Sequence, residues 1–148
     1  MWPLAQLLPH AGNMILLDRI EYHDEESIVA YARVREDAPF TQPDGSYPAY
    51  VGIEIMAQSI AAYAGLRAKQ AGEPVKLGFL LGTRRYECNV ERFPAGSELR
   101  ICARRSLEDE SGMGVFECEL DAHEIRVTAR LNVYRPENVD GFIRETMP

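Results

Sequence analysis

The chain has 148 residues, of which 46% are hydrophobic, and a formal net charge of −7. This length suits a single domain over residues 1–148 with a sizeable core, and the negative charge argues against a nucleic-acid partner, because phosphate binding needs a basic face. No run reaches the roughly 20 apolar residues of a membrane span, and the first ten residues lack the pattern of a signal peptide. We therefore expect a cytoplasmic globular protein.

The predicted elements begin with a short helical turn at Leu4–Leu8, which Pro9 stops. Two strand-like runs follow at Met14–Tyr22 and Ser27–Arg35, and the polar turn between them predicts a hairpin. Residues 36–49 are rich in proline, aspartate and glycine, which is typical of a loop. This loop leads into a long apolar segment.

The long segment predicts a helix that begins after Pro48 and ends at Gly65, and a second loop at Gln70–Pro74 leads out of it. Apolar residues occupy nearly all of its sides, so we expect the helix to be enclosed. Glu54 and Gln58 stand four residues apart and therefore share one side of it. A carboxylate in such surroundings is expected to be paired, protonated or functional. The alternative is a solvated acid in the first turn, where the helix dipole favours negative charge.

Four further strand-like runs complete the chain, and the short turns between them predict an antiparallel sheet. The last run alternates clearly, with Ile125, Val127 and Ala129 on one face and Arg126 and Thr128 on the other. The economical way to bury one long apolar helix is to wrap a single sheet around it. We therefore predict an α+β fold with a curved antiparallel sheet around a central helix. The runs are residues 76–90, 98–107, 114–120 and 123–134.

Several motifs in a fixed order resemble those of a known family. The chain is similar to the hotdog-fold β-hydroxyacyl-ACP dehydratases, and most of all to the shorter dehydratases of aryl polyene and related fatty-acid-like pathways. The similarity runs from about Leu8 to Tyr134 and so covers nearly the whole chain. The motifs are Leu8-Pro-His-Ala-Gly-Asn-Met-Ile-Leu-Leu-Asp-Arg19, Ala38-Pro-Phe40, Pro48, Glu54-Ile-Met-Ala-Gln58, Gly78-Phe79 and Pro94-Ala-Gly96.

The resemblance implies an enzyme that removes water from a 3-hydroxyacyl thioester on acyl carrier protein and yields a 2-enoyl thioester. It also implies a homodimer or an oligomer of dimers, with sheets joined edge to edge and active sites at the interface. In the family a Glu on the central helix faces a His of the partner subunit, and Glu54 and Gln58 match the helix motif. The family's His-Phe-Pro-Gly segment has no counterpart, because residues 41–47 contain no histidine.

Dehydration needs a base for the C2 proton, an acid for the departing hydroxyl and polarisation of the carbonyl, without a metal or cofactor. His10 is our candidate for the acid–base partner of Glu54, since His23 lies in a hairpin turn and His123 follows a tight turn. The alternative for His10 is a structural hydrogen bond to a neighbouring backbone group. Asp44 is a weaker candidate, because a Pro-Asp-Gly turn selects aspartate for its turn chemistry.

The substrate is expected to pass between subunits into a tunnel beside the helix. The backbone N–H groups of Val51 and Gly52 at the helix start are expected to bind the thioester carbonyl. The predicted substrate-binding side chains are those of Gln58, Tyr63, Phe79 and Leu80, with Leu81 as a further wall residue, although core packing is an alternative role for the apolar ones.

Carrier docking on an acidic chain requires a local basic patch. Arg84 and Arg85 are our candidates for docking the acyl carrier protein, and Arg104–Arg105 is a second basic pair. Solvated strand faces and turn ends are an alternative role for both pairs.

Two other functions fit the same layout. In a hotdog thioesterase, Glu54 would activate water, while Gln58 and the helix N-terminus would hold the carbonyl; the absent family histidine favours this alternative. A non-catalytic subunit that binds acyl-ACP or partners a dehydratase would keep the tunnel and lose the chemistry, and the presence of Glu54 argues against it.

Overall fold

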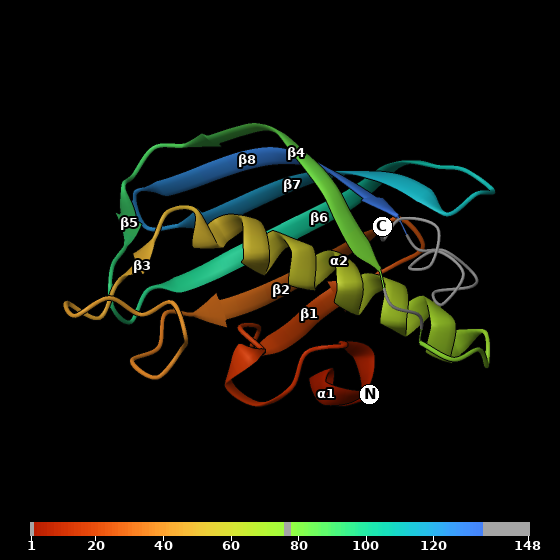
Figure 1. Cartoon of the computed structure of the whole chain (residues 1–148), viewed down its shortest axis with the longest axis horizontal. Helices are drawn as coiled ribbons and strands as arrows, with labels where there is room; N and C mark the ends of the chain where they lie inside the picture. Colours follow the sequence, from red (N-terminus) through yellow and green to blue (C-terminus); the bar gives the residue numbers. More distant parts are fainter. Residues whose placement is uncertain (1, 76–77, 135–148) are drawn as a thin grey trace, which may run out of the picture.

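One long helix lies across a six-stranded antiparallel sheet, and a two-stranded sheet lies near the start of that helix (Figure 1). The computed structural model describes residues 2–75 and 78–134, without the side chains of Phe79 and Leu81. The elements are α1 (Leu4–Leu7), the 3-10 turn η1 (Gly12–Met14), β1 (Arg19–His23), β2 (Ser27–Arg33), β3 (Tyr47–Pro48), α2 (Val51–Gln70), β4 (Phe79–Cys88), β5 (Arg92–Phe93), β6 (Glu98–Glu108), β7 (Met113–Ala122) and β8 (Ile125–Tyr134).

The large sheet has the strand order β1-β2-β6-β7-β8-β4, and all neighbouring strands are antiparallel. β3 and β5 form the small sheet, in which Tyr47 pairs with Phe93. Within the described residues β4 pairs with β8 on one side, so β4 forms one edge of the large sheet. The predicted α+β architecture, with one antiparallel sheet around one long helix, is confirmed.

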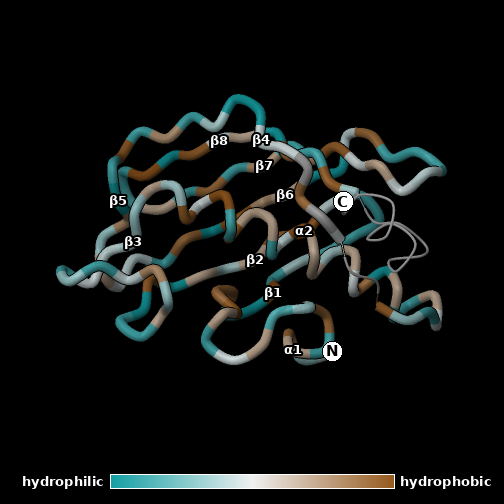
Figure 2. Tube along the Cα trace, viewed as in Figure 1, coloured by the Kyte–Doolittle hydropathy of each residue, from teal (hydrophilic) through white to brown (hydrophobic). Residues whose placement is uncertain are grey.

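The core lies between α2 and the sheet. In β8 the side chains of Ile125, Val127, Ala129 and Leu131 are buried, while Arg126 is exposed, as the alternation predicts. Figure 2 shows hydrophobic stretches along α2 and the central strands and hydrophilic stretches in the outer loops. Burying apolar surface at both contact faces is the main favourable contribution to folding, and it fixes α2 on the sheet.

The prediction that the long helix ends at Gly65 is wrong, because α2 continues to Gln70. Gly65 is needed for close packing of α1 on α2. A Cβ atom built on Gly65 would lie 2.5 Å from the backbone oxygen of Leu7, whose own side chain is fully buried. The helix ends instead before Gly72, which has φ of +69°, a conformation that glycine adopts easily.

The first predicted strand also differs from the structure, since β1 begins at Arg19 instead of Met14. Residues 12–14 form the turn η1, which Gly12 enters with φ of +59°. Side chains from other elements then bind the backbone of residues 13–16. Those contacts replace the strand pairing that the apolar run Met14–Leu17 suggests.

We expect Gly65→Ala to destabilise the protein. The added methyl group forces the Leu7 backbone away from α2, and overpacking of this kind costs about 1–3 kcal/mol in free energy of unfolding. Urea denaturation measures the change. Gly82→Ala is the matched control, because a Cβ atom there has nothing within 4 Å. For Gly65→Ala, a free energy of unfolding equal to or above that of the wild type would contradict this expectation. It would show that α1 moves aside and that the higher helix propensity of alanine outweighs the overpacking.

Candidate functional site

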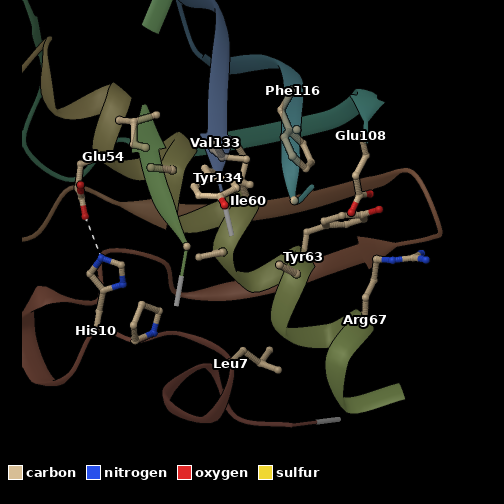
Figure 3. A pocket seen from close by; sticks show the side chains of 18 residues that line it. Leu7, His10, Glu54, Ile60, Tyr63, Arg67, Glu108, Phe116, Val133 and Tyr134 are labelled. Carbon is tan, nitrogen blue, oxygen red and sulfur yellow. Dashed lines mark ion pairs between the residues drawn. The ribbon is translucent and has the colours of Figure 1, made fainter. Parts of the chain in front are cut away.

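A cavity of about 250 Å³ lies beside α2, lined by α2, the N-terminal segment and the ends of β4, β6, β7 and β8 (Figure 3). Glu54 and His10 lie at one end of it, and Tyr63, Arg67 and Glu108 lie at the other. The lining residues are Leu7, Pro9, His10, Glu54, Ala57, Ile60, Ala61, Tyr63, Ala64, Arg67, Gly78, Leu80, Glu108, Gly112, Gly114, Phe116, Val133 and Tyr134.

Small side chains along α2 leave room for this cavity. Ala57, Ala61 and Ala64 follow Glu54 on one face of the helix, at spacings of three or four residues. From Glu54 to Arg67 the helix rises by roughly 20 Å, at about 1.5 Å for each residue. The cavity therefore offers a long and mostly apolar channel that begins at a carboxylate.

Glu54 and His10 contact each other within the same chain. His10 Nε2 lies 3.1 Å from Glu54 Oε1, and the two side chains are 25% and 35% exposed. His10 Nδ1 is buried and has no hydrogen-bond partner among the described residues. The alternative of a histidine that binds the backbone is therefore not observed. Glu54 is half-buried and paired, and an imidazole with one free nitrogen beside a carboxylate has the composition of an acid–base pair.

Gln58 holds Glu54 and the N-terminal segment together. Its Nε2 donates to Glu54 Oε1 at 3.1 Å and to Met14 O at 2.7 Å, and its Oε1 accepts from Leu16 N at 2.8 Å. The side chain is fully buried and does not line the cavity. Both amide hydrogens are thus engaged. The structure therefore places Gln58 outside the lining of the cavity, and substrate binding by Gln58 stays a prediction.

The first residues of α2 pack against Tyr86 and do not face the cavity. Gly52 N–H donates to Ala49 O at 3.1 Å, and the Tyr86 hydroxyl donates to the same oxygen at 2.5 Å. Burial raises the pKa of the Tyr86 phenol, so this donor keeps its proton. A Cβ atom on Gly52 would lie 2.2 Å from Tyr86 Oη, and neither Val51 nor Gly52 lines the cavity. The structure therefore does not bring the predicted carbonyl-binding amides into the cavity.

Two predicted wall residues, Tyr63 and Leu80, do line the cavity. Tyr63 is buried, its hydroxyl donates to Glu25 O and accepts from Arg105 Nη1 at 3.2 Å, and burial raises its pKa. Leu80 is 43% exposed. The predictions for the side chains of Phe79 and Leu81 lie outside the described residues.

The two predicted docking arginines lie on β4, away from the cavity. Arg84 and Arg85 are both exposed, and Arg85 has φ of +57° at a bulge in the pairing of β4 with β8. Arg85 lines a smaller hollow of about 150 Å³ together with Glu87, Glu117 and Arg130. Basic and acidic side chains are therefore mixed at this edge.

Local contacts account for Asp44, the weaker candidate for the acid–base partner. Asp44 accepts hydrogen bonds from Ser46 and pairs with Arg92 at 2.8 Å, contacts that lower its pKa to about 2. In the described part of the chain no group of three or more His, Cys, Asp and Glu side chains could hold a metal ion. The helices described there are too short or too polar to cross a membrane.

Sequence reasoning missed much of the lining of the cavity. Ala57, Ala61 and Ala64 have a detectable signal, since their spacing continues the face of Glu54. The sequence carries no such signal for Leu7, Gly114 and Phe116, because these residues lie on segments far from α2 in the chain and reach the cavity through the fold.

Comparison with known proteins assigns the family. The sequence matches the ApeP-like family, described as ApeP dehydratase, over residues 2–144. A chain of the dehydratase heterocomplex ApeI:P from Xenorhabdus doucetiae is 34% identical, with a TM-score of 0.91 and coverage of 100% of this chain and 99% of that chain. The chain belongs to the ApeP-like dehydratase family. The predicted resemblance to the short dehydratases of aryl polyene pathways is confirmed for this ApeP-like dehydratase.

More distant structures share the fold of the ApeP-like dehydratase. A thioesterase from Pseudomonas aeruginosa is 18% identical, with a TM-score of 0.55 and coverage of 80% of each chain. The PaaI protein of E. coli, from the phenylacetic acid degradation operon, is 13% identical, with a TM-score of 0.57 and coverage of 78% of this chain and 81% of that chain. These similarities support the hotdog fold alone. No curated protein matched the sequence.

We expect Gln58→Met to destabilise the ApeP-like dehydratase. The variant leaves the buried Leu16 N–H without its acceptor, and an unsatisfied buried group costs about 1–3 kcal/mol in free energy of unfolding. Denaturant titration measures the loss. Ser59→Ala is the control, because the buried Ser59 hydroxyl donates to Ile55 O inside the same helix and links no other segment. An unchanged free energy of unfolding in Gln58→Met would contradict the role of Gln58 as a link.

Proposed function

We propose that this ApeP-like dehydratase removes water from a 3-hydroxyacyl thioester on acyl carrier protein in aryl polyene biosynthesis, and that it works in the cytoplasm. The observation that carries the proposal is the contact between His10 Nε2 and Glu54 Oε1 at 3.1 Å, at one end of a long channel. Family membership supports the hydro-lyase chemistry. The channel supports an extended acyl chain as the substrate.

Each group of the pair takes one proton-transfer role in the proposed reaction. Glu54 Oε1 already contacts His10 and Gln58, which leaves Oε2 for the substrate. The His10 imidazole, whose side chain is 25% exposed, removes the C2 proton. Protonated Glu54 gives its proton to the C3 hydroxyl, the C–O bond breaks, and the electrons of the C2–H bond form the C2=C3 double bond. The products are the enoyl thioester and water.

The proton balance then needs resetting. One turnover leaves His10 with an added proton and Glu54 without its proton. Their direct contact and their partial exposure allow both to return to the starting state through each other and through solvent. No oxidant, reductant or metal enters this balance.

The acyl chain is proposed to extend from this pair along Ala57, Ala61 and Ala64 toward Tyr63. An apolar chain gains by leaving water, and alanine side chains leave space for it against the helix. The carrier protein stays outside, and the phosphopantetheine arm brings the thioester to Glu54.

We further propose that a second hotdog subunit completes the assembly. The edge strand β4 supports this, because an unpaired strand edge presents N–H and C=O groups to another chain. The related ApeI:P structure is a heterocomplex of dehydratase subunits. Whether the partner here is an identical or a different chain is decided by measuring the mass of the complex.

The other two functions have less support. The thioesterase reaction needs an amide to hold the carbonyl, whereas both N–H groups of Gln58 are engaged with Met14 and Glu54. A non-catalytic subunit has no need for a histidine and a carboxylate in contact. The contact of His10 with Glu54 therefore favours catalysis.

We expect Glu54→Gln and His10→Ala each to lower dehydration by about a hundredfold or more, the scale of a lost acid–base group. The test incubates purified protein with 3-hydroxyacyl-ACP and follows the intact acyl-ACP by mass spectrometry for loss of one water. Circular dichroism confirms that both variants are folded. Wild-type rates in both variants would refute the acid–base roles. Release of free carrier thiol would indicate a thioesterase, and tight binding without reaction would indicate a partner subunit.

We expect Arg84→Glu with Arg85→Glu to weaken carrier docking. Reversing two exposed positive charges reduces attraction to an acidic carrier and makes binding less dependent on salt. The KM for acyl-ACP should rise severalfold, while kcat at saturation stays near the wild-type value. Arg100→Glu is the control, since Arg100 is an exposed arginine on β6. An unchanged KM and salt dependence would remove these arginines from docking.

A further inference from the structure

His10 lies on a segment that has little regular structure of its own. Between α1 and β1 this segment contains the short turn η1, and residues 11–14 are exposed. Backbone hydrogen bonds within the turn run from Met14 N to Ala11 O and from Ile15 N to Gly12 O. These local bonds shape the turn, but they do not fix its position relative to Glu54 on α2.

Side chains from two other elements fix that position. Gln58 on α2 binds Met14 O and Leu16 N. Arg35, just after β2, binds the carbonyls on either side of Met14. Its Nη1 donates to Ile15 O at 2.9 Å, and its Nη2 donates to Asn13 O at 3.1 Å. Two side chains therefore hold four successive residues, with Gln58 binding residues 14 and 16 and Arg35 binding residues 13 and 15.

Arg35 is itself fixed in place. The backbone N–H of Arg35 donates to Tyr47 Oη at 3.1 Å, and its backbone carbonyl accepts from Thr41 Oγ1 at 2.7 Å. Its Nε lies 3.4 Å from a carboxylate oxygen of Asp37, whose side chain is 80% exposed. The guanidinium is thus anchored chiefly by backbone groups, and its planar fork spans two carbonyls, which a lysine ammonium cannot match.

On the other side of His10 the chain is also held. The Leu7 side chain is fully buried, and the Leu7 backbone packs against Gly65 of α2. His10 therefore lies three residues after one anchor and three residues before the other. Gly65 and Gln58 both belong to α2, whereas Arg35 lies after β2 and holds the segment from a separate part of the chain.

We propose that Arg35 is a positioning residue of the active site, which sets His10 opposite Glu54 through the backbone of residues 13–15. This inference rests on the proposed acid–base role of His10. Arg35 does not line the cavity, so it acts through the segment and not on the substrate. A displacement of about 1 Å in a catalytic group can cost as much as a hundredfold in rate.

The first test compares Arg35→Gln and Arg35→Lys with wild type in dehydration of 3-hydroxyacyl-ACP, using the full chain in its native assembly. We expect Arg35→Gln to lower kcat by about 10- to 100-fold and to leave KM within about twofold, because the channel is unchanged. Arg35→Lys should restore part of kcat, since its ammonium can reach one of the two carbonyls. Arg19→Gln is the control, because Arg19 contacts Glu98 and the Tyr31 ring on the exposed sheet surface.

A double-mutant cycle with His10→Ala separates positioning from a general structural effect. If Arg35 acts through His10, then Arg35→Gln in the His10→Ala background should change kcat by less than about twofold, because the group it positions is absent. If the two losses multiply in the double variant, the proposal is overturned. Should Arg35→Gln fail to fold by circular dichroism, the same cycle is run with Arg35→Lys.

The cycle also keeps the two proposals distinguishable. Full activity of His10→Ala would refute the acid–base role of His10 and the positioning role of Arg35 with it. A lowered kcat in His10→Ala together with a wild-type kcat in a folded Arg35→Gln would refute the positioning role alone. Loss of kcat in both single variants without a further loss in the double variant supports the proposal.

Discussion

A buried amide must have its hydrogen bonds satisfied, and the way Gln58 meets this demand determines the geometry of the site. One side chain on α2 binds a carboxylate on its own helix and two backbone groups of a segment more than forty residues earlier in the chain. Leaving any of these buried groups without a partner is costly. The helix and the N-terminal segment are therefore joined in one register, and His10 is brought to Glu54.

The hydrophobic pattern predicts the fold well, because the helical period and the strand alternation of apolar residues both depend on which faces are buried. The antiparallel strands, the hairpin at Asp24–Glu26 and the enclosed helix all follow from it. The pattern failed where tertiary contacts overrode it. Gly65 does not end α2 but allows α1 to approach it, and the apolar run from Met14 does not begin a strand.

The candidate site was predictable in part. A charge in an apolar helix indicates Glu54, and elimination among the three histidines favours His10. Their contact depends on Gln58 and Arg35, which bind backbone atoms of residues 13–16. A sequence carries no signal for such contacts, because any residue supplies the same backbone carbonyl. For the same reason the sequence does not distinguish Arg35, which binds backbone carbonyls after β2, from an arginine that is exposed to solvent.

The position of both proposed acid–base groups in one polypeptide also bears on how such assemblies diversify. Where a histidine and a glutamate come from different subunits, each subunit is constrained by the chemistry of the other. A pair built within one chain would free a neighbouring subunit from supplying a reacting group. That neighbour could then change its sequence, or be exchanged for a relative, and alter which acyl groups are accepted while proton transfer stays intact.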